Sequence, residues 1–344
     1  MTHKLAECVR GAKRRIGLAT LGALAACALL AGCVNQHPDR PSSGEGDGSP
    51  RLVSTSAAVV SIAEKLDLDL VGVPKTSSEL PERYADATVV GPPMAPDLEV
   101  LAKLHPDFVI SPVSLENDLR PKYVSIGKPS IFVDLNSVEG LYDSIAYLGG
   151  RFGRAEEAQR LLDERDRFME GYLASIEGKP RPRVLILMGL PGSYLAATPR
   201  SYAGSLAALA GADNVYADAE DAFVNANTED MLARDPDIIL RTSHALPDEV
   251  LKMFSDEFST NDVWKHFRAV REGRVFDLSN DRFGMSATFR YPDALRDLRS
   301  ILYEDSNGSD GSSASVFKAD ASDSPEAGSD EGGAPSAPSD SIGG

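Results

Sequence analysis

The amino-acid sequence predicts an α/β protein in which two α/β lobes are joined by a single long helix. Between residues 51 and 303, short β-rich runs alternate with segments whose apolar residues recur at helical spacing. A helix, a Pro-Asp corner and a β-rich run that begin at Asp97 return later in the chain, starting at Asn227. The segment between these copies, residues 139–178, is rich in helix formers and charge. One continuous three-layer α/β domain is the alternative interpretation.

The first lobe is expected over residues 51–138 and the second over residues 179–303. The first opens with a strand in RLVSTS, a helix in AAVVSIAEKLD and a further strand in LVGVP. The paired segments are DLEVLAKLHPDFVISPVS in the first lobe and NTEDMLARDPDIILRTSH in the second. Each has the pattern of a short helix, a corner and a buried strand, so the two lobes are expected to share one α/β plan.

Residues 139–178 are expected to link the lobes through a helix. A helix of about 20 residues within this segment would span ~30 Å, which is long enough to bridge two lobes. Two lobes joined in this way describe a receptor that holds a ligand in the cleft between them.

Residues 1–32 have the layout of a signal peptide. Five basic residues and one acidic residue precede an apolar run of about 15 residues, which is too short to span a membrane. The following Leu30-Ala31-Gly32-Cys33 resembles the lipobox of bacterial lipoproteins, which implies that Cys33 is diacylated and becomes the N-terminus. A two-chain anchor would hold the protein stably at a membrane surface. A plain secretory signal is the alternative.

Both ends of the remaining chain are expected to lie outside the lobes. Residues 33–50 are polar and rich in Pro, Gly and Ser, which is the composition of a flexible tether. Residues 304–344 carry nine acidic residues against Lys318 and almost no large apolar residues. A disordered acidic tail is therefore expected there, with a partner-binding segment as the alternative.

The composition of the mature chain argues against several kinds of site. Cys8 and Cys27 would leave with the signal peptide and Cys33 would carry lipid, so disulfides and thiolate metal sites are not expected in the folded part. Loss of residues 1–32 removes four net positive charges and takes the formal charge from −17 to −21. A chain this acidic is not expected to bind nucleic acid.

Enzyme signatures are missing from the sequence. It contains no G-x-S-x-G, H-E-x-x-H, P-loop or G-x-G-x-x-G motif. Of the five histidines, His3 and His37 lie in the signal peptide and the tether. His105 is expected at a helix C-terminus, where an imidazole is favourable. His266 is expected either on a helix surface or in packing beside Trp264 and Phe267. No catalysis is therefore expected.

Met94 and His244 indicate a ligand site when they are taken together. Met94, in GPPMAPD, lies between Pro93 and Pro96, which restrict the backbone around it. His244 follows the β-rich run IILRTS, and open α/β sheets bind ligands at the carboxyl ends of their strands. The structural alternatives are a core role for Met94 and an ordinary loop role for His244. A thioether and an imidazole, one from each lobe, suit iron held in a porphyrin.

Six stretches carry a resemblance to a known family. They are LVGVP with TSS and LPERY, VGPPMAPDLE, VLILMGLPGSYLAAT, NTEDMLARDPDIILRTSHALP, FSDEFSTNDVWKHF and RFGMSAT. On these stretches, residues 51–303 resemble the iron-regulated surface determinant haem-binding lipoproteins of Gram-positive bacteria.

The resemblance implies a class III periplasmic-binding-protein-like fold and a function in transport. The expected protein is a monomeric, lipid-anchored receptor on the extracytoplasmic face of the cell membrane, which delivers haem to the permease of an ABC transporter. A ferric siderophore or corrinoid receptor of the same fold is one alternative. An extracytoplasmic enzyme that modifies haem or a chelate is another.

The resemblance also implies roles for particular residues. Met94 and His244 match the axial ligands of the haem iron. The positions that match the propionate contacts are Ser56, Ala57, Thr76, Ser77 and Ser78. This sequence departs from the family pattern by placing Lys75 before the second group and Glu79 after it. Lys75 is therefore either a partner of the propionates or a solvated loop lysine.

Two further sets of residues match functional positions of the family. Those that match loops lining the cleft are Tyr194, Phe283 and Met285, with core packing as the alternative. Glu99 and Glu229 lie at equivalent places near the starts of the paired helices and match carboxylates that dock on arginines of the permease. The alternative is the ordinary preference of a carboxylate for a helix N-terminus.

Overall fold

The computed structural model describes residues 49–244 and 246–303. The predicted signal peptide, the lipid site at Cys33 and the acidic tail lie outside the described residues, as do residues 33–48 of the predicted tether. Within the described part of the chain, no helix is both long and apolar enough to cross a membrane.

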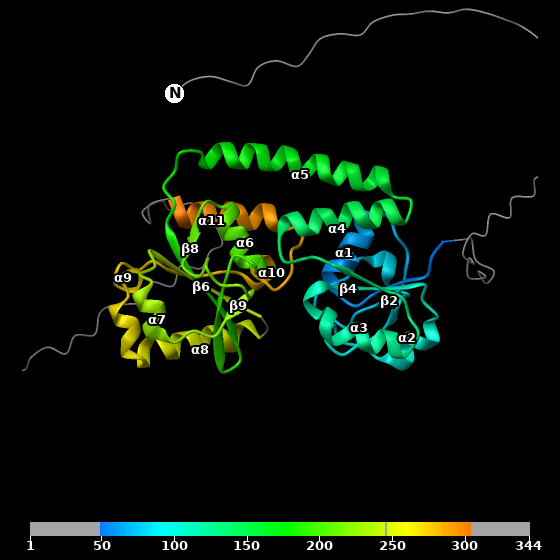
Figure 1. The fold of residues 1–344 in the computed structure, drawn as a ribbon, viewed down its shortest axis with the longest axis horizontal. Coiled ribbons are helices and arrows are strands. Elements are labelled where there is room, and N and C mark those ends of the chain that lie inside the picture. Colours follow the sequence, from blue (N-terminus) through cyan, green and yellow to red (C-terminus); the bar gives the residue numbers. More distant parts are fainter. Residues whose placement is uncertain (1–48, 245, 304–344) are drawn as a thin grey trace, which may run out of the picture. The chain divides into compact units, whose positions relative to one another are not determined.

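The first lobe is built on a five-stranded parallel sheet with the order β3-β2-β1-β4-β5 (Figure 1). Its central strand β1 is buried along its whole length, as expected where helices cover both faces of a parallel sheet. Leu52 and Val53 are neighbours in β1, but they belong to different core clusters because successive side chains of a strand point to opposite faces of the sheet. The strands are β1 (Leu52–Ser54), β2 (Leu70–Val73), β3 (Thr88–Val89), β4 (Phe108–Pro112) and β5 (Ser130–Val133).

Helices pack on both faces of this first sheet. The apolar face of α1 (Ala57–Lys65) joins the cluster that contains Leu52. The apolar residues of α2 (Leu98–Leu104) and α3 (Glu116–Ser125) join the cluster that contains Val53. In Figure 1, α1 lies on one side of the strands, and α2 and α3 on the other. Two 3-10 turns complete the lobe, η1 (Glu82–Tyr84) and η2 (Val113–Leu115).

The second lobe has a mixed sheet with the order β11-β10-β6-β7-β9, and β8 pairs with β6. β10, β6 and β11 are parallel, whereas β7 runs antiparallel to β6 and to β9. Along β6, Ile186 and Leu187 belong to different core clusters, so both faces of this sheet are covered too. The strands are β6 (Arg183–Leu190), β7 (Ser193–Ala197), β8 (Asp213–Asn214), β9 (Phe223–Val224), β10 (Ile238–Ser243) and β11 (Val275–Asp277).

The helices of the second lobe are interspersed among these strands along the chain. They are α6 (Tyr202–Leu209), α7 (Thr228–Ala233), α8 (Pro247–Thr260), η3 (Asp262–His266), α9 (Arg268–Arg271), α10 (Asn280–Phe283) and α11 (Tyr291–Tyr303). The paired segments predicted at Asp97 and Asn227 are confirmed as α2 with β4 and as α7 with β10.

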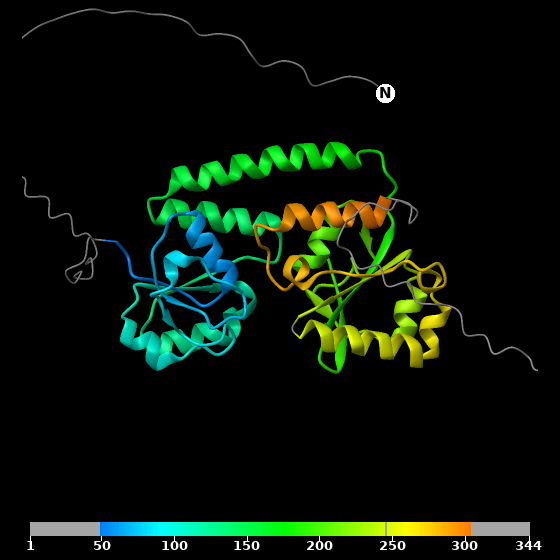
Figure 2. The ribbon, with the colours of Figure 1, turned by 180° about the vertical axis from the view of Figure 1, so that it is seen from behind.

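The predicted linking segment contains two helices, α4 (Val138–Arg151) and α5 (Ala155–Ile176), which pack against each other (Figures 1 and 2). α5 has 22 residues and is about 33 Å long, which fits the long helix expected from the sequence. The chain reverses between them at Gly153, whose φ of 72° lies in the left-handed region that glycine adopts readily.

The two sheets share one apolar core with these linking helices. The largest core cluster includes side chains of both sheets and of α4, α5 and α11. The Tyr172 hydroxyl of α5 donates a hydrogen bond to the carbonyl of Leu295 in α11 at 2.9 Å. Tyr142 of α4 packs edge-on against Tyr291 of α11, with ring centroids 6.0 Å apart. Side-chain contacts with α11 therefore hold the linking helices in place, in addition to the covalent connection of the chain.

The two Pro-Asp corners make the same contacts in both lobes. In the first, the Asp107 carboxylate accepts a hydrogen bond from the backbone N–H of Arg51 at 2.8 Å. The backbone N–H of Asp107 donates to the carbonyl of Arg51 at 2.9 Å. In the second, Asp237 and Arg183 exchange the same pair of bonds at 2.7 and 2.8 Å. Each corner thus fixes the start of its lobe's leading strand, which supports a duplicated plan.

Candidate functional site

The loop that carries Met94 connects β3 with α2 and is closed by its own hydrogen bonds. The N–H of Asp97 donates to the carbonyl of Val90 at 2.7 Å, and the N–H of Ala95 donates to Pro92 at 3.1 Å. Asp97 also caps α2, because its side chain accepts hydrogen bonds from the first-turn amides. The loop is consequently held at both of its ends.

Met94 lies at the tip of this loop and is 63% exposed. Gly91 permits the turn into the loop, since its φ is 95° and an added Cβ would lie 3.1 Å from the backbone nitrogen of Asp97. A methionine this exposed does not fill a core, so the interpretation of Met94 as a core residue is excluded. The thioether stands at the carboxyl edge of the first sheet.

His244 directly follows β10 at the carboxyl edge of the second sheet. Its N–H donates to the carbonyl of Gly189 at 2.9 Å, which continues the pairing of β10 with β6 by one residue. Asn280, at the start of α10, donates a side-chain hydrogen bond to the carbonyl of Ser243. The backbone before His244 is therefore anchored on both sides, while the imidazole itself is exposed.

The other two described histidines lie where the sequence placed them. His105 is the C-cap of α2, with a left-handed φ of 46°, and its side chain is exposed. His266 is the last residue of η3 and is exposed next to the buried Phe267.

The N-terminus of α1 opens at the same carboxyl edge as Met94. Ser56 is its N-cap, but the Ser56 side chain makes no capping hydrogen bond, and the first turn contains no acidic residue. First-turn amides in this state attract an anionic acceptor. Ser56 itself is buried and Ala57 is half-buried, so backbone amides rather than the serine hydroxyl are the groups on offer.

Residues 75–78 lie against the Met94 loop, because the N–H of Lys75 donates to the carbonyl of Gly91 at 2.8 Å. Thr76 turns this segment by accepting a hydrogen bond from the N–H of Ser78 at 3.0 Å. The side chains of Lys75, Ser77 and Ser78 are exposed. Among the residues that the structure describes, Lys75 forms no ion pair. Residues 75–78 and the Met94 loop are thus brought together.

The three second-lobe positions expected to line a cleft differ in burial. Phe283 is only 1% exposed and belongs to the core, which is the alternative stated for it. Tyr194 is half-buried and packs against Phe254 and Trp264, with ring centroids 5.8 and 6.2 Å away. Met285 is half-buried.

Glu257 of α8 was not expected from the sequence, although it organises the surroundings of Tyr194. Its Oε1 accepts hydrogen bonds from Asn261, Tyr194 and Trp264 at 2.9, 3.1 and 3.2 Å. Partial burial opposes the charged form, but these three donors together outweigh it and hold the pKa of Glu257 below its ordinary value. The sequence offers no periodic signal that separates this glutamate from a solvated one.

A buried ion pair also escaped sequence reasoning. Arg241 of β10 and Asp277 of β11 form a two-pronged pair, with both N–O distances 2.7 Å and side chains 9% and 6% exposed. The guanidinium also lies 4.9 Å from the centre of the Phe258 ring. In the sequence, this ion pair could have been noticed from the one charged residue in each of two apolar strands. Arg241 also lies shortly before His244 in the chain.

The two predicted docking carboxylates occupy equivalent places. Glu99 and Glu229 are each the second residue of a helix, α2 and α7, behind the capping residues Asp97 and Asn227. Both are exposed, and neither forms an ion pair among the residues that the structure describes.

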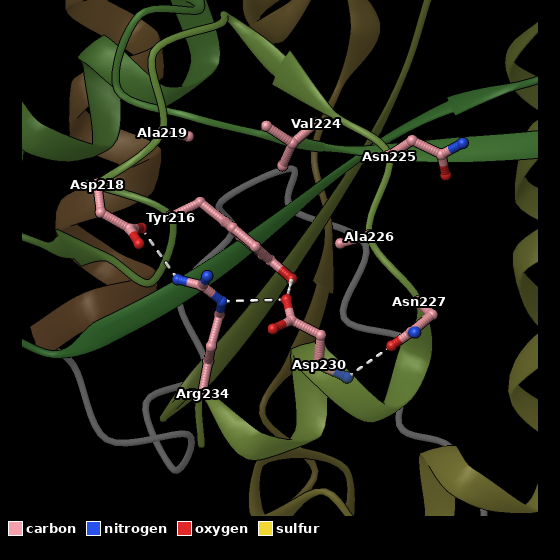
Figure 3. Close-up of a pocket in the computed structure, with 9 residues that line it drawn as sticks. All are labelled: Tyr216, Asp218, Ala219, Val224, Asn225, Ala226, Asn227, Asp230 and Arg234. Carbon is pink, nitrogen blue, oxygen red and sulfur yellow. Dashed lines mark hydrogen bonds and ion pairs between the residues drawn. The ribbon is translucent and has the colours of Figure 1, made fainter.

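A pocket of about 340 Å³ opens beside α7 in the second lobe (Figure 3). It contains neither Met94 nor His244 and is lined by Tyr216, Asp218, Ala219, Val224, Asn225, Ala226, Asn227, Asp230 and Arg234.

The geometry places a thioether, an imidazole and an uncapped helix at the carboxyl edges of two α/β sheets. The family model for periplasmic binding proteins matches residues 52–281. The chain belongs to the periplasmic binding protein family. The fold is the class III type of this family, with two α/β lobes and a helical link.

Relatives at about 40% identity extend over nearly all of the described residues. The "High-affinity heme uptake system protein IsdE" of Staphylococcus aureus strain Newman is 40% identical over 263 residues, which covers 75% of this chain and 89% of the relative. The crystal structure of S. aureus IsdE complexed with heme has a TM-score of 0.71 and 39% identity, and covers 75% of this chain and 100% of that one. An ABC transporter substrate-binding protein from Listeria monocytogenes EGD-e gives a TM-score of 0.72 and 43% identity over the same shares.

Proposed function

We propose that this chain is a lipid-anchored extracytoplasmic receptor that binds haem and delivers it to the permease of an ABC transporter. The observation that carries the proposal is the exposed thioether of Met94 on a closed loop stiffened by prolines. Such a loop loses little conformational freedom when its side chain binds a ligand. The haem-bound relative of 39% identity supports haem as the ligand.

The haem iron is assigned to Met94 and His244 as axial ligands. A thioether and a neutral imidazole form a recurrent pair on haem iron, and each lobe supplies one of them. Both side chains are exposed and both stand on anchored backbone. Met285 and Tyr194 are assigned to the second-lobe wall of the site, and Phe283 supports it from the core.

The propionates are assigned to the first lobe. The uncapped amides that follow Ser56 and begin at Ala57 suit one carboxylate. The segment Thr76-Ser77-Ser78 offers hydroxyl groups, and the exposed Lys75 beside it supplies a positive charge.

Anchoring and docking complete the proposal. Lipid on Cys33 would hold the receptor on the extracytoplasmic face of the membrane, as a monomer that performs no catalysis. Glu99 and Glu229 would contact basic residues of the permease, because two carboxylates at a fixed separation set register and orientation.

An absorption titration with haemin tests the ligand assignment. For the lipid-free chain that starts at Val34, we expect one haemin per chain and a low-spin spectrum. Met94→Leu and His244→Ala should each weaken binding about tenfold or more and disturb that spectrum. Because both residues are exposed, the free energy of unfolding should change by less than about 0.5 kcal/mol.

Val124→Ala is the matched control, since Val124 is another exposed apolar residue of the first lobe. It should leave the titration unchanged. A wild-type chain that does not bind haemin would overturn the proposed cargo. Haemin binding that survives in Met94→Leu with the wild-type spectrum would overturn only the assignment of Met94.

A further inference from the structure

Leu246 lies two residues after His244 and is held in an environment that a leucine does not prefer. Its backbone is left-handed, with φ 48° and ψ 60°, at the N-cap of α8. A residue at this position usually has extended backbone and a side-chain oxygen that accepts from the first turn, and Leu246 has neither. Its side chain is 52% exposed. The left-handed backbone and the missing cap cost stability, and the half-exposed side chain returns only part of it by packing.

The other described residues with a left-handed φ, glycines aside, are of a different kind. They are Asp67, His105 and Asp235, with φ values of 52°, 46° and 42°. Aspartate and histidine enter this region more readily than most residues with a Cβ. Each of the three also ends a helix, α1, α2 or α7, where left-handed backbone is common. Of these four residues, Leu246 alone has both a type and a helix position that oppose its backbone conformation.

The neighbours of Leu246 on both sides hold this backbone in place. Before it, the N–H of His244 donates to the carbonyl of Gly189 at 2.9 Å. After it, α8 packs closely on the same glycine, because a Cβ added at Gly189 would lie 2.2 Å from Val250 and 2.8 Å from Phe254. Both of those side chains are fully buried. Backbone strain persists only where the surrounding structure enforces it in this way, and it concentrates at ligand sites.

The position of Leu246 puts it within reach of a porphyrin bound at His244. Cα atoms two residues apart are at most about 7 Å from each other, which is less than the width of a porphyrin. The propionates are assigned to the first lobe, so the second lobe would meet the apolar part of the macrocycle. An exposed leucine matches that part in chemistry, whereas a chelate with a polar surface would not cover it.

We propose that Leu246 is a haem contact, which packs on the apolar part of the porphyrin beside His244 and slows the loss of the ligand. The inference rests on the proposed function, because it requires haem to be held at His244. The enforced backbone keeps the side chain available before the ligand arrives, so little ordering is needed on binding. Covering the exposed half of a leucine side chain corresponds to about fivefold to tenfold in affinity.

Two measurements on the lipid-free chain that starts at Val34 test this proposal: haemin transfer to an excess of apomyoglobin, and thermal unfolding without haemin. Leu246→Asn should lose haemin about five to ten times faster than wild type, because an amide replaces the apolar contact. Asparagine adopts left-handed backbone readily and can cap α8, so the same variant should unfold about 2 °C higher. Its low-spin spectrum should persist, since both proposed iron ligands are unchanged.

Two further variants separate the apolar contact from the backbone effect. Leu246→Met keeps the apolar area, so it should restore haemin retention to within about threefold of wild type without a gain in thermal stability. His105→Gly is the matched control for the backbone. His105 is also exposed and left-handed, but it lies at the end of α2 opposite the Met94 loop. The glycine should raise the unfolding temperature and leave haemin transfer unchanged.

Faster haemin loss together with a higher unfolding temperature in Leu246→Asn, and unchanged loss in His105→Gly, would support the proposal. If Leu246→Asn retains haemin as wild type does, this inference is wrong while the proposed function stands. If Leu246→Asn both unfolds earlier and loses haemin faster, Leu246 has a structural role and the inference is also wrong. A wild-type chain that binds no haemin would overturn both the inference and the proposed cargo.

Discussion

At the scale of single residues, the informative side chains are those whose surroundings differ from what their type prefers. Met94 is an apolar side chain held in solvent, whereas Arg241 and Asp277 are charges held in the interior. The buried charges are tolerated only because they satisfy each other. Glu257 is a milder case, since three donors stabilise its charged form.

The buried pair leads to a prediction about stability. Asp277→Ala should lower the free energy of unfolding by about 3–5 kcal/mol, because the Arg241 guanidinium would remain buried without its carboxylate. Lys252→Ala, which breaks the exposed pair with Asp256, should cost less than about 1 kcal/mol. Urea unfolding followed by circular dichroism measures both. Similar losses in the two variants would mean that burial does not determine the strength of the first pair.

The hydrogen bonds at Glu257 predict a dependence of stability on pH. Its pKa in the folded state is below the unfolded value of about 4.3, so the charged form stabilises the fold above that pH. This contribution is lost as the pH falls through the folded pKa. Glu257→Gln should therefore be less stable than wild type at pH 7, and the difference should shrink below about pH 4. Thermal unfolding across pH 3 to 7 measures it, and a constant difference would refute the prediction.

At the scale of elements, the helix in each copy of the duplicated segment begins with a side-chain cap. Asp97 caps α2 and Asn227 caps α7 through side-chain bonds to first-turn amides. Ser56 stands at the same position of α1 without such a bond. The two capped helices carry the carboxylates for which docking is proposed, and the uncapped one presents its amides where a propionate is proposed.

Substitution of these capping residues separates the two kinds of helix start. Asp97→Ala and Asn227→Ala should each cost about 0.5–2 kcal/mol of stability, because first-turn amides lose an acceptor. Ser56→Ala should cost less than about 0.5 kcal/mol, since its side chain makes no capping bond. Denaturant unfolding of the three variants is the measurement. A loss for Ser56→Ala as large as the other two would contradict the distinction.

At the scale of the whole described chain, the link between the lobes is a packed unit. α4, α5 and α11 share the largest core cluster with both sheets. The N–H of Ala287 donates to the carbonyl of Leu135 at 2.7 Å, a direct bond between segments beside the two sheets. Bending at such a link would disturb close-packed side chains, so large hinge motions are disfavoured.

Solution scattering tests this stiffness. Addition of one equivalent of haemin to the lipid-free chain should leave the radius of gyration unchanged within error, because the braced helices permit only a small change of lobe angle. His244→Ala with the same haemin addition is the control for scattering from the ligand. A marked decrease of the radius of gyration in wild type alone would show a large closure and refute the prediction.

The sequence by itself determined the alternation of strands and helices, the recurrence of the Asp97 segment at Asn227 and the two candidate iron ligands. These features are local, because periodicity, capping residues and prolines act over a few neighbouring positions. It also placed His244 beyond the end of a β-rich run, which follows from chain order alone.

Only the tertiary structure decided which side chains are exposed and which groups meet across the chain. Met94 is exposed to solvent, Phe283 is buried in the core, and Arg241 pairs with Asp277 of the neighbouring strand. Burial and pairing depend on the packing of segments distant in sequence, and no local pattern encodes them.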